Sequence, residues 1–478
     1  MAQPLVNPKE DFSGWYNDIV YRADLAGQSP VRGCIIVKPY GYEIWEALKA
    51  ALDKRFKATG HQNAYFPLFI PESFLKREAQ HVEGFSPELA VVTIGGGKEL
   101  EERLIVRPTS ETIIGETFAE WIQSYRDLPL LINQWANVVR WEMRTRPFLR
   151  TMEFLWQEGH TAHATEADAE AETLQMLDVY ADVVINEAAI PVIKGQKSSS
   201  ERFAGALRTY TIEAMMGDKR ALQSGTSHNL GQNFAKAFNI QYLDENNVRQ
   251  HCWTTSWGMS WRVIGGIIMT HGDEKGLRLP PRMAPIQVVI VPIYKTAEEQ
   301  ASVMEAAERV RKALVDSDIR VKLDSRNETP GFKYNDWEMR GVPLRLEIGP
   351  RDVQNNSVVA ARRDIPGKEG KAFLSQDNLV PQIKDLLIAI QANMLAQATA
   401  FRDANIFDVR NYDELKQVIE AGGFARGWWN EDADAEARIK AETQATHRCY
   451  PLEQPGGEGP DLLTGEPAQR IALFAKAY

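Results

Sequence analysis

The chain has 478 residues, of which 44% are hydrophobic and 25% charged, and its formal net charge is −10. This length exceeds what one hydrophobic core serves and predicts about three domains. The acidic balance argues against non-specific nucleic-acid binding over the whole surface, and the longest apolar run, residues 286–293, is far shorter than the ~18 residues of a membrane-spanning helix.

The N-terminal segment gives no sign of secretion. Residues 1–11 lack the apolar stretch of a signal peptide. Cys34, Cys252 and Cys449 are few, odd in number and widely separated, so we expect no disulfide framework. Together these features predict a cytoplasmic protein that does not associate with a membrane.

The first clear element is a helix. Residues 41–58 carry Ile44, Leu48, Leu52 and Phe56 at four-residue spacing, which predicts an amphipathic helix. A glycine at position 60 ends it, and residues 61–69 predict an aromatic-rich strand that Pro67 interrupts. A helix followed by such a strand is common, so on its own this segment is best interpreted as ordinary core.

Two short patterns are reminiscent of a phosphate or metal site. Residues 95–98, Gly-Gly-Gly-Lys, match half of a phosphate loop but lack the earlier glycine spacing and a Ser or Thr after the lysine. We therefore interpret them as a hairpin turn. His160-x-x-His163 has neither a third ligand nor a His-Glu-x-x-His pattern around it, and we interpret both histidines as pocket or core residues.

The segment 138–158 carries the most chemistry. Arg140, Glu142, Arg150 and Phe154 place two cations, a carboxylate and an aromatic ring within fifteen residues. Arginine binds phosphate oxygens through a planar fork of donors, glutamate accepts a hydrogen bond from an exocyclic amine, and phenylalanine offers a face to a base. The group indicates an ATP site without a phosphate loop. An ordinary β-hairpin with exposed Arg–Glu pairs explains this one segment equally well.

The middle of the chain alternates helix and strand. Residues 165–187 predict a helix that Thr165 caps. Residues 208–215 and 221–224 predict paired strands. Residues 256–269 predict a polar strand followed by a glycine-rich helix, with Arg262 at the junction.

Prolines at positions 280, 281 and 285 predict a linker. Beyond it, residues 287–292 predict a buried strand, Thr296 begins a helix, and residues 319–323 and 344–348 alternate as strands do. This order predicts a small α/β domain over residues 285–390. Residues 403–478 form a separate terminal module that contains Trp428 and Trp429.

In order, residues 41–69, 138–158 and 256–270 resemble motifs 1, 2 and 3 of class II aminoacyl-tRNA synthetases. Longer strings resemble one family of that class, the prolyl-tRNA synthetases. They are Arg107-Pro-Thr-Ser-Glu-Thr, Phe154-Leu-Trp-Gln-Glu-Gly-His, Gln223-Ser-Gly-Thr-Ser-His and Trp257-Gly-Met-Ser-Trp-Arg. The resemblance covers nearly the whole chain and is to the archaeal/eukaryote-like type, which ends in a tyrosine, here Tyr478.

The resemblance implies an α/β fold with an α+β catalytic core. Residues 1–280 would form the class II catalytic domain around an antiparallel sheet, residues 285–390 an anticodon-binding α/β domain, and residues 403–478 a small α/β module. It also implies ATP-dependent attachment of L-proline to tRNA(Pro) through prolyl-adenylate by a homodimer, with magnesium accompanying ATP. A carboxylate nucleophile is already ionised at pH 7, so the first step requires no general base.

Roles follow where the residues match. The resemblance implies that Arg140 and Arg262 are catalytic. The residues implied to bind ATP are Arg140, Glu142, Arg150, Thr151, Phe154, Gln223, Thr226, Ser260 and Arg262, with Gln223 near magnesium. Those implied to bind proline are Thr109, Glu111, Arg140, Trp156, Glu158, His160, Phe203 and His228. For Thr109 and Glu111, a helix N-cap with an acid in the first turn is an equally good interpretation.

Two departures from the family pattern change what we expect. Only 101 residues separate Phe154 from Ser256, too few for the large editing insertion of typical bacterial relatives. The zinc module of many relatives has four cysteines, but the corresponding positions here read Trp429, Asp461 and Thr464. Zinc needs about four sulfur or imidazole ligands, so we expect none, and no other metal site of the protein itself.

Three further residues and two rival functions remain open. Arg345, Glu347 and Arg351 suit the edges of guanine in an anticodon, although salt bridges on a strand face explain them equally well. A non-catalytic paralogue would have lost the arginines at 140 or 262 or the pocket acids, and all are present. A sister enzyme for threonine, serine or glycine would line its pocket differently.

Overall fold

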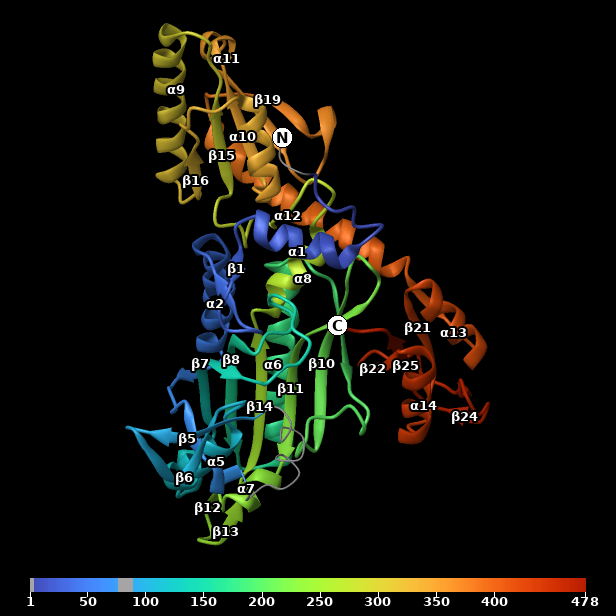
Figure 1. The fold of residues 1–478 in the computed structure, drawn as a ribbon. Coiled ribbons are helices and arrows are strands. Elements are labelled where there is room, and N and C mark those ends of the chain that lie inside the picture. The colour runs from blue at the N-terminus through green and yellow to red at the C-terminus, as the bar shows by residue number, and fades with distance from the viewer. Residues whose placement is uncertain (1–3, 76–88) are drawn as a thin grey trace.

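The computed structural model describes residues 4–75 and 89–478. Figure 1 shows a long sheet with its helices, an α/β domain above it, and a C-terminal module at the side. Helix α12 (Leu379–Asp403) runs from the α/β domain to the C-terminal module. No helix within these two ranges combines the length and the apolar composition needed to cross a membrane.

A large sheet forms the centre of the molecule and confirms the predicted antiparallel catalytic sheet. Its central strands pair antiparallel, and between β9 and β3 in the described sheet only the edge strand β3 runs parallel to its neighbour, β7. Within the described residues, the order across this part of the sheet is β9 (Val192–Gln196), β10 (Arg208–Met215), β11 (Ala221–Gly231), β14 (Trp253–Ser260), β8 (Glu153–His163), β7 (Leu130–Val139) and β3 (Gln62–Asn63).

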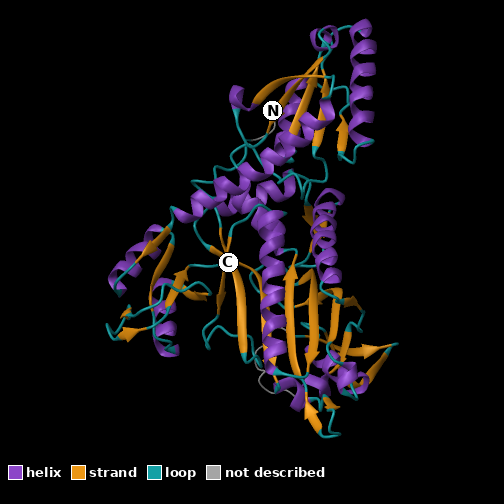
Figure 2. Cartoon of the chain, turned by 180° about the vertical axis from the view of Figure 1, so that it is seen from behind, coloured by secondary structure: helices purple, strands orange, loops and turns teal. Residues whose placement is uncertain are grey.

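One face of this sheet is covered by α6 (Glu166–Asn186), which packs on β11 and β14 and contacts α2 (Pro39–Ala58). Figure 2 shows the long helix along the sheet. The Thr165 side chain accepts a hydrogen bond from Asp168 N, as its predicted N-cap role requires. The four apolar residues that predicted α2 are all buried, which confirms that helix.

The pleat of the sheet determines which side chains meet the helices. Successive residues of a strand point to opposite faces. Trp257 of β14 packs on Phe56 of α2 and Tyr180 of α6, so Ser256, Gly258 and Ser260 lie on the other face. A Cβ placed on Gly159 would lie 2.1 Å from the Trp257 ring, which shows how closely β8 and β14 approach there.

The prediction of one strand over residues 61–69 is wrong. The structure has two short strands in different sheets, β3 and β4 (Phe69–Pro71), with irregular chain between them. Pro67 lacks the N–H that a continuous strand needs, and the buried Arg107 occupies the gap, donating to Phe66 O at 2.7 Å. The predicted glycine turn at residues 95–98 is confirmed, since Gly95 pairs with Lys98 in a hairpin.

Shorter elements surround the large sheet. They are α1 (Phe12–Arg22), β1 (Ala26–Gln28), β2 (Ile35–Val37), α3 (Glu72–Leu75), β5 (Ala90–Gly95), β6 (Lys98–Val106), α5 (Glu111–Trp121), η2 (Tyr125–Asp127), α7 (Asn233–Ala237), β12 (Gln241–Leu243), β13 (Arg249–His251) and α8 (Arg262–His271). Helix α8 follows β14 after one residue, so Arg262 stands at the predicted strand–helix junction.

The α/β domain has a mixed sheet in the order β16-β15-β17-β18-β19 among its described residues. Strands β15, β16 and β17 are parallel, and β18 and β19 add antiparallel strands. Its elements are β15 (Val288–Pro292), α9 (Ala297–Val315), β16 (Val321–Leu323), α10 (Pro330–Met339), β17 (Leu344–Ile348), α11 (Pro350–Gln354), β18 (Ser357–Arg362), η3 (Gly367–Gly370) and β19 (Lys371–Ser375).

The C-terminal module extends the large sheet rather than standing apart. Its strand β22 (Thr446–Pro451) pairs with β9, Tyr450 opposite Gln196 and Pro451 opposite Gly195. A side chain at Gly195 would collide with Cys449, since its Cβ would lie 2.5 Å from the sulfur. The module also contains β20 (Ile406–Asp408), α13 (Tyr412–Ala421), β21 (Phe424–Trp428), α14 (Ala433–Thr443), β23 (Gly459–Pro460), β24 (Pro467–Ala468) and β25 (Ile471–Ala475).

A buried ion pair joins this module to the large sheet. Arg448 of β22 donates through Nε and Nη2 to Glu213 Oε2 at 3.0 and 2.9 Å, and Glu213 is fully buried. Lys197 Nζ lies 3.5 Å from Glu213 Oε1. Burial acts to raise the pKa of Glu213, but Arg448 and Lys197 hold it below its ordinary 4.5.

We expect Arg448→Met to destabilise the protein by about 3 kcal/mol, because removing one partner leaves the other charge buried and only partly compensated. A carboxylate with a depressed pKa contributes stability above pH 4.5, and that contribution is lost as the pH falls through its folded value. The difference in the free energy of unfolding between wild type and variant should therefore decrease below pH 4.5. Urea unfolding at pH 7 and pH 4 measures it.

Glu213→Gln in the Arg448→Met background is the control, since it removes the uncompensated charge and should restore part of the loss. An Arg448→Met variant as stable as wild type at pH 7 would contradict the stabilising role of the pair.

Candidate active site

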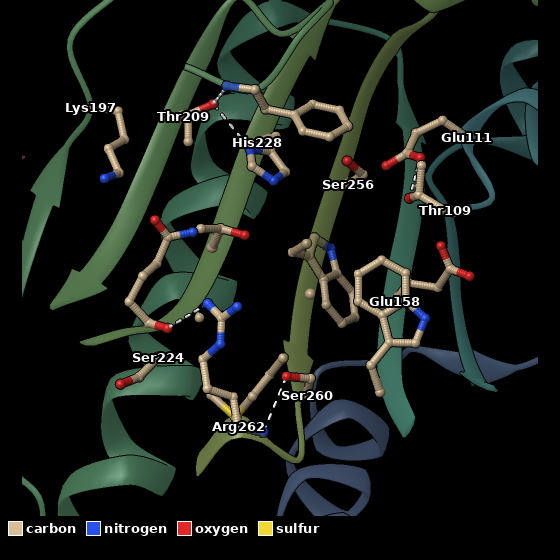
Figure 3. Close-up of a pocket in the computed structure, with 18 of the residues that line it drawn as sticks. Thr109, Glu111, Glu158, Lys197, Thr209, Ser224, His228, Ser256, Ser260 and Arg262 are labelled. Carbon is tan, nitrogen blue, oxygen red and sulfur yellow. Dashed lines mark hydrogen bonds between the residues drawn. The ribbon is translucent and has the colours of Figure 1, made fainter. Parts of the chain in front are cut away.

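A cavity of about 260 Å³ opens on the face of the large sheet opposite α6. Residues from β8, β11 and β14 form its floor, and Figure 3 shows their side chains projecting from the strands. Most of the residues predicted for a site line it: Thr109, Glu111, Arg140, Phe154, Trp156, Glu158, Phe203, Gln223, Thr226, His228, Ser260 and Arg262.

Arg140 stands at the end of β7, where the chain leaves the sheet. Its Nε donates to Pro108 O at 3.1 Å, which fixes the base of the guanidinium. The guanidinium carbon lies 5.3 Å from the ring centre of Phe154 and 5.5 Å from that of Trp156. Two aromatic rings of β8 therefore border the cation within the cavity.

Arg262 enters the same cavity from the start of α8. Its Nε donates to Leu149 O at 3.0 Å and its Nη1 to Gln223 O at 3.4 Å, so backbone carbonyls hold the group. Burial, followed by the positive charges of Arg150 and Arg140, lowers the pKa of Arg262 to about 10. The guanidinium is still protonated at neutral pH. Like charges crowded in this way favour a polyanionic ligand.

A smaller cavity of about 40 Å³ continues the site and shares Arg140, Phe154, Ser260 and Arg262 with the first. The predicted residues Glu142, Arg150 and Thr151 line it. Arg150 Nε lies 3.4 Å from Glu142 Oε1. In the described part of the chain, the buried Thr151 Oγ1 has no hydrogen-bond partner, so it is available to a ligand.

The opposite end of the cavity is acidic. Thr109 Oγ1 donates to Glu111 Oε2 at 2.5 Å, and Glu111 begins α5 with only 7% of its surface exposed. Ser110, not Thr109, occupies the N-cap position. The N-cap interpretation of Thr109 is therefore wrong, and its hydroxyl and the carboxylate lie together at the cavity wall.

Glu158 is held by neighbours on several sides. Its carboxylate accepts hydrogen bonds from Ser110 N and Oγ at 3.1 and 2.5 Å and from Gln134 Nε2 at 2.9 Å. His160 Nε2 lies 3.0 Å from Glu158 Oε2. His160 does not line the main cavity; it stands behind Glu158 in a smaller one. Burial acts to lower the pKa of His160, but Glu158 raises it above 6.5.

The other histidine of the pair faces elsewhere. His163 contacts Thr161, with Nε2 2.8 Å from the hydroxyl. An odd spacing on one strand places His160 and His163 on opposite faces of the sheet. Both histidines are buried, in agreement with their interpretation as pocket or core residues.

A third wall is formed by Phe203, Thr209 and His228. The rings of Phe203 and His228 stack with centres 4.5 Å apart. Thr209 Oγ1 accepts from Phe203 N at 3.0 Å and lies 3.0 Å from His228 Nδ1. Burial lowers the pKa of His228 to about 4, although Glu111 acts in the opposite direction. The imidazole is therefore neutral at physiological pH.

The sequence did not single out several cavity residues. Lys197, Glu201, Thr209 and Ser256 line the cavity (Figure 3 labels all but Glu201). The first three belong to no recognisable motif, and Ser256 begins the segment that resembles motif 3 without having been assigned a role. The odd–even pattern of β14 could have indicated Ser256, because its neighbour Trp257 faces the core. Nothing in the sequence around the lysine indicates that it borders the cavity.

No cluster of three or more histidine, cysteine, aspartate or glutamate side chains suited to a metal occurs in residues 4–75 and 89–478. In the C-terminal module, the Asp461 carboxylate accepts hydrogen bonds from Asn430 N at 2.8 Å and from Leu463 N and Thr464 N at 2.9 Å each. Trp429 is buried and donates Nε1 to Glu436 at 3.3 Å. At two of the positions where relatives carry zinc-binding cysteines, Asp461 therefore makes hydrogen bonds and Trp429 packs in the core of the module.

The candidate anticodon residues lie in the α/β domain. Arg345 on β17 donates to Glu347 Oε1 at 3.0 Å and to Glu338 at 3.3 Å, and its guanidinium stacks 3.9 Å from the ring centre of Tyr334. Arg345 lines a cavity of about 440 Å³ that also contains Trp337, Arg362, Arg363, Lys368 and Lys371. Glu347 also accepts from Lys371 at 3.1 Å, whereas Arg351 lies on α11, exposed and outside this cavity.

Comparison with known proteins gives matches along most of the chain. Residues 92–271 match the tRNA synthetase class II core domain (G, H, P, S and T), residues 287–386 an anticodon binding domain, and residues 412–478 the C-terminal domain of prolyl-tRNA synthetase.

Whole-length relatives agree with these domains. The chain is 59% identical to a proline–tRNA ligase, chloroplastic/mitochondrial, of Arabidopsis thaliana over 99% of this chain and 88% of that protein. It is 60% identical to a proline–tRNA ligase of Chloroflexus aurantiacus over 98% of each chain. It is also 55% identical to that of Symbiobacterium thermophilum over 98% of this chain and 97% of that protein.

The pKa values of His228 and His160 should be shifted in opposite directions from that of a free histidine. We expect His228 to remain neutral down to about pH 4, and His160 to take up its proton above pH 6.5. Nuclear magnetic resonance of ring-labelled histidine between pH 4 and 9 measures both, with His228→Asn and His160→Gln variants assigning the signals. A His228 signal with a midpoint near 6.5 would contradict its desolvated environment.

Proposed function

This chain belongs to the prolyl-tRNA synthetase family, and we propose that the cavity on β8, β11 and β14 is its active site. The protein attaches L-proline to tRNA(Pro) in an ATP-dependent reaction that passes through prolyl-adenylate and releases AMP and diphosphate. The observation that carries the placement is the convergence of Arg140, Arg150 and Arg262 on two adjoining cavities.

ATP would occupy the arginine end of the site. Phe154 and Arg262 offer the two faces between which adenine stacks, and Glu142 and Thr151 lie beside that space with groups suited to the adenine edge. Arg140 and Arg150 would bind the phosphates, and Arg262 would reach the γ-phosphate. Gln223, Thr226 and Ser260 line the adjoining wall, where the ribose and phosphates would lie.

Proline would occupy the acidic end. Its secondary ammonium has two N–H donors and one positive charge, so the Thr109 hydroxyl and the Glu111 carboxylate satisfy it. His228, Phe203 and Trp156 would contact the ring. A neutral His228 adds no positive charge next to the ammonium. Glu158 would form part of this wall, and His160 would support it from behind, since the Glu158 carboxylate already binds Ser110 and His160.

The chemistry of the first step needs positioning and charge neutralisation. An oxygen of the proline carboxylate attacks the α-phosphorus of ATP, the new O–P bond forms, and the bond to the β-phosphate oxygen breaks to release diphosphate. Arg140 would bind both the carboxylate and the α-phosphate and hold them in reach of each other. The 3′-hydroxyl of the terminal adenosine of tRNA then attacks the prolyl carbonyl and releases AMP.

ATP acts in this class of enzymes with a divalent metal, which we propose is magnesium. Magnesium prefers oxygen ligands, most of which would be phosphate and water oxygens here. The side-chain oxygen of Gln223 at the cavity wall fits that preference. When bound, it neutralises part of the triphosphate charge.

A structural zinc ion does not fit the C-terminal module. Asp461 is engaged by three backbone N–H groups and the Thr464 hydroxyl, and Trp429 and Thr464 are not zinc ligands. Cys449 is buried between the module and Gly195, and burial raises the pKa of its thiol, which disfavours the thiolate that zinc requires. We propose that hydrogen bonds of Asp461 hold the loop that zinc holds in many relatives.

The α/β domain would read the anticodon. Arg345 is the strongest candidate, because it lines a cavity bordered by several cations and by Trp337. Glu347 of β17 and Lys371 of β19, whose side chains are in contact, would contribute beside it, while the exposed Arg351 would act only at the margin. Arg345 and Glu347 form the strand-face salt bridge that was the alternative interpretation of these residues. Arg345 nevertheless lines the cavity, where an anticodon base would contact it.

We also propose that the protein is a cytoplasmic homodimer without an editing domain. Tyr42, Tyr65 and Phe69, in the segment that resembles motif 1, expose 42%, 71% and 44% of their surface, as an interface would require. The chain between β8 and β14 folds as α6, α7, strands β9 to β13 and the short loops that join them, with no inserted domain among these residues. All three cysteines are free, consistent with a reducing compartment.

Arg140→Ala tests the proposed site. We expect proline-dependent ATP–pyrophosphate exchange to fall by at least ~10²–10³-fold, since a fixed cation at the reacting phosphate is lost, while thermal unfolding changes little. Arg144→Ala, an exposed arginine in the same loop, is the matched control and should exchange at the wild-type rate. Exchange at that rate by Arg140→Ala itself would refute the placement.

The zinc proposal is tested on purified protein. We expect far less than one zinc per chain by atomic emission, and no loss of aminoacylation after dialysis against a zinc chelator. Asp461→Ala should lower the unfolding temperature, because several backbone N–H groups lose their acceptor. Stoichiometric zinc would overturn the proposal.

A further inference from the structure

The loop between β9 and β10 borders the active-site cavity. Lys197, Glu201 and Phe203 of this loop line it. Phe203 stacks on His228, and its backbone N–H donates to Thr209, which in turn contacts His228. The conformation of this short segment therefore determines one wall of the proposed proline pocket.

The C-terminal module holds the serines of this loop. Glu436 of α14 accepts hydrogen bonds through Oε2 from the hydroxyls of Ser198, at 2.7 Å, and of Ser200. Glu431 Oε1 accepts from Ser199 N at 2.6 Å. One carboxylate of a remote module thus binds two hydroxyls of the loop, and a second binds its backbone.

The contact between Ser198 and Glu436 is buried, whereas Ser199, Ser200 and Glu431 are exposed. Ser198 has no exposed surface, and Glu436 has 6%. The second oxygen of Glu436 accepts from Trp429 Nε1 at 3.3 Å, so its side chain is fixed from both ends. Burial raises the pKa of Glu436, while the bonds from Ser200 and Ser198 act against that. A carboxylate placed here without these partners would be costly, because buried polar groups require hydrogen bonds.

The base of the loop adjoins the same module, because Gln196 of β9 pairs with Tyr450 of β22. Lys197 precedes Ser198 and lies 3.5 Å from Glu213, which Arg448 of β22 binds. Figure 3 shows Lys197 at the edge of the pocket, near Thr209. The segment from Ser198 to Ser200 is therefore bound to the C-terminal module, whereas the partner of Lys197 belongs to β10. Phe203 follows three residues after Ser200.

We propose that Glu436 is a positioning residue for the proline pocket: from the C-terminal module it fixes Ser198 and Ser200, and thereby holds Phe203 against His228. This inference rests on the proposed function, because it requires proline to bind beside Phe203 and His228. The module would then set the affinity for the amino acid without touching it.

Glu436→Ala tests the proposal in the full-length protein by ATP–pyrophosphate exchange. We expect the KM for proline to rise about tenfold, as the loss of a charge-assisted hydrogen bond predicts, with the KM for ATP and kcat within about twofold of wild type. Glu436→Gln retains one acceptor oxygen and should restore part of the affinity. Glu420→Ala, an exposed glutamate of the same module, is the control and should behave as wild type.

A mutant cycle separates positioning from general destabilisation. Ser198→Ala with Ser200→Ala should raise the KM for proline as Glu436→Ala does, and the triple variant should be no worse than Glu436→Ala alone. Additive effects, or equal losses in kcat, ATP affinity and unfolding temperature, would overturn the positioning role.

His228→Ala distinguishes this inference from the proposed function. If His228→Ala weakens proline binding and Glu436→Ala does not, the pocket stands and the role of Glu436 is wrong. If neither variant changes the KM for proline, the placement of proline itself is wrong, and the inference falls with it.

Discussion

Strands β8, β11 and β14 present alternate residues to opposite faces, and the site depends on that alternation. On the helix side, Trp257 packs between β8, α2 and α6. On the other side, neighbouring positions carry Phe154, Trp156, Thr226, His228 and Ser260. Aromatic packing on one face thereby fixes the spacing of polar groups on the other. A shift of one residue in register would exchange core and site.

The site also brings three arginine side chains of like charge close together. Arg140, Arg150 and Arg262 share adjoining cavities. Burial, followed by the positive charges of Arg150 and Arg140, lowers the pKa of Arg262. Backbone carbonyls of Pro108, Leu149 and Gln223 compensate by accepting from two of these guanidiniums. The groups are thus held in place by the protein itself. In the proposed site a triphosphate would supply the missing negative charge, which is the condition for electrostatic preorganisation.

The features that could be predicted from the sequence are those encoded by contiguous residues. The helices over residues 41–58 and 165–187, the junction at Arg262 and the arginine and aromatic residues of the hairpin were predicted because their periodicity or motif is contiguous. The strand over residues 61–69 was wrong because a buried arginine from residue 107 takes the place of strand pairing there. Lys197, Glu201 and Thr209 were missed, since they follow no motif. The bond between Ser198 and Glu436 joins residues 238 positions apart, which no local pattern reveals.

The pairing of β22 with β9 has a consequence for how the chain can be shortened. In the intact protein both long sides of β9 are occupied, one by β10 and the other by β22. A chain cut before the C-terminal module would expose the outer backbone amides and carbonyls of β9 as an unprotected sheet edge. Such edges recruit strands from other molecules, so the isolated catalytic domain would be prone to aggregation rather than merely inactive.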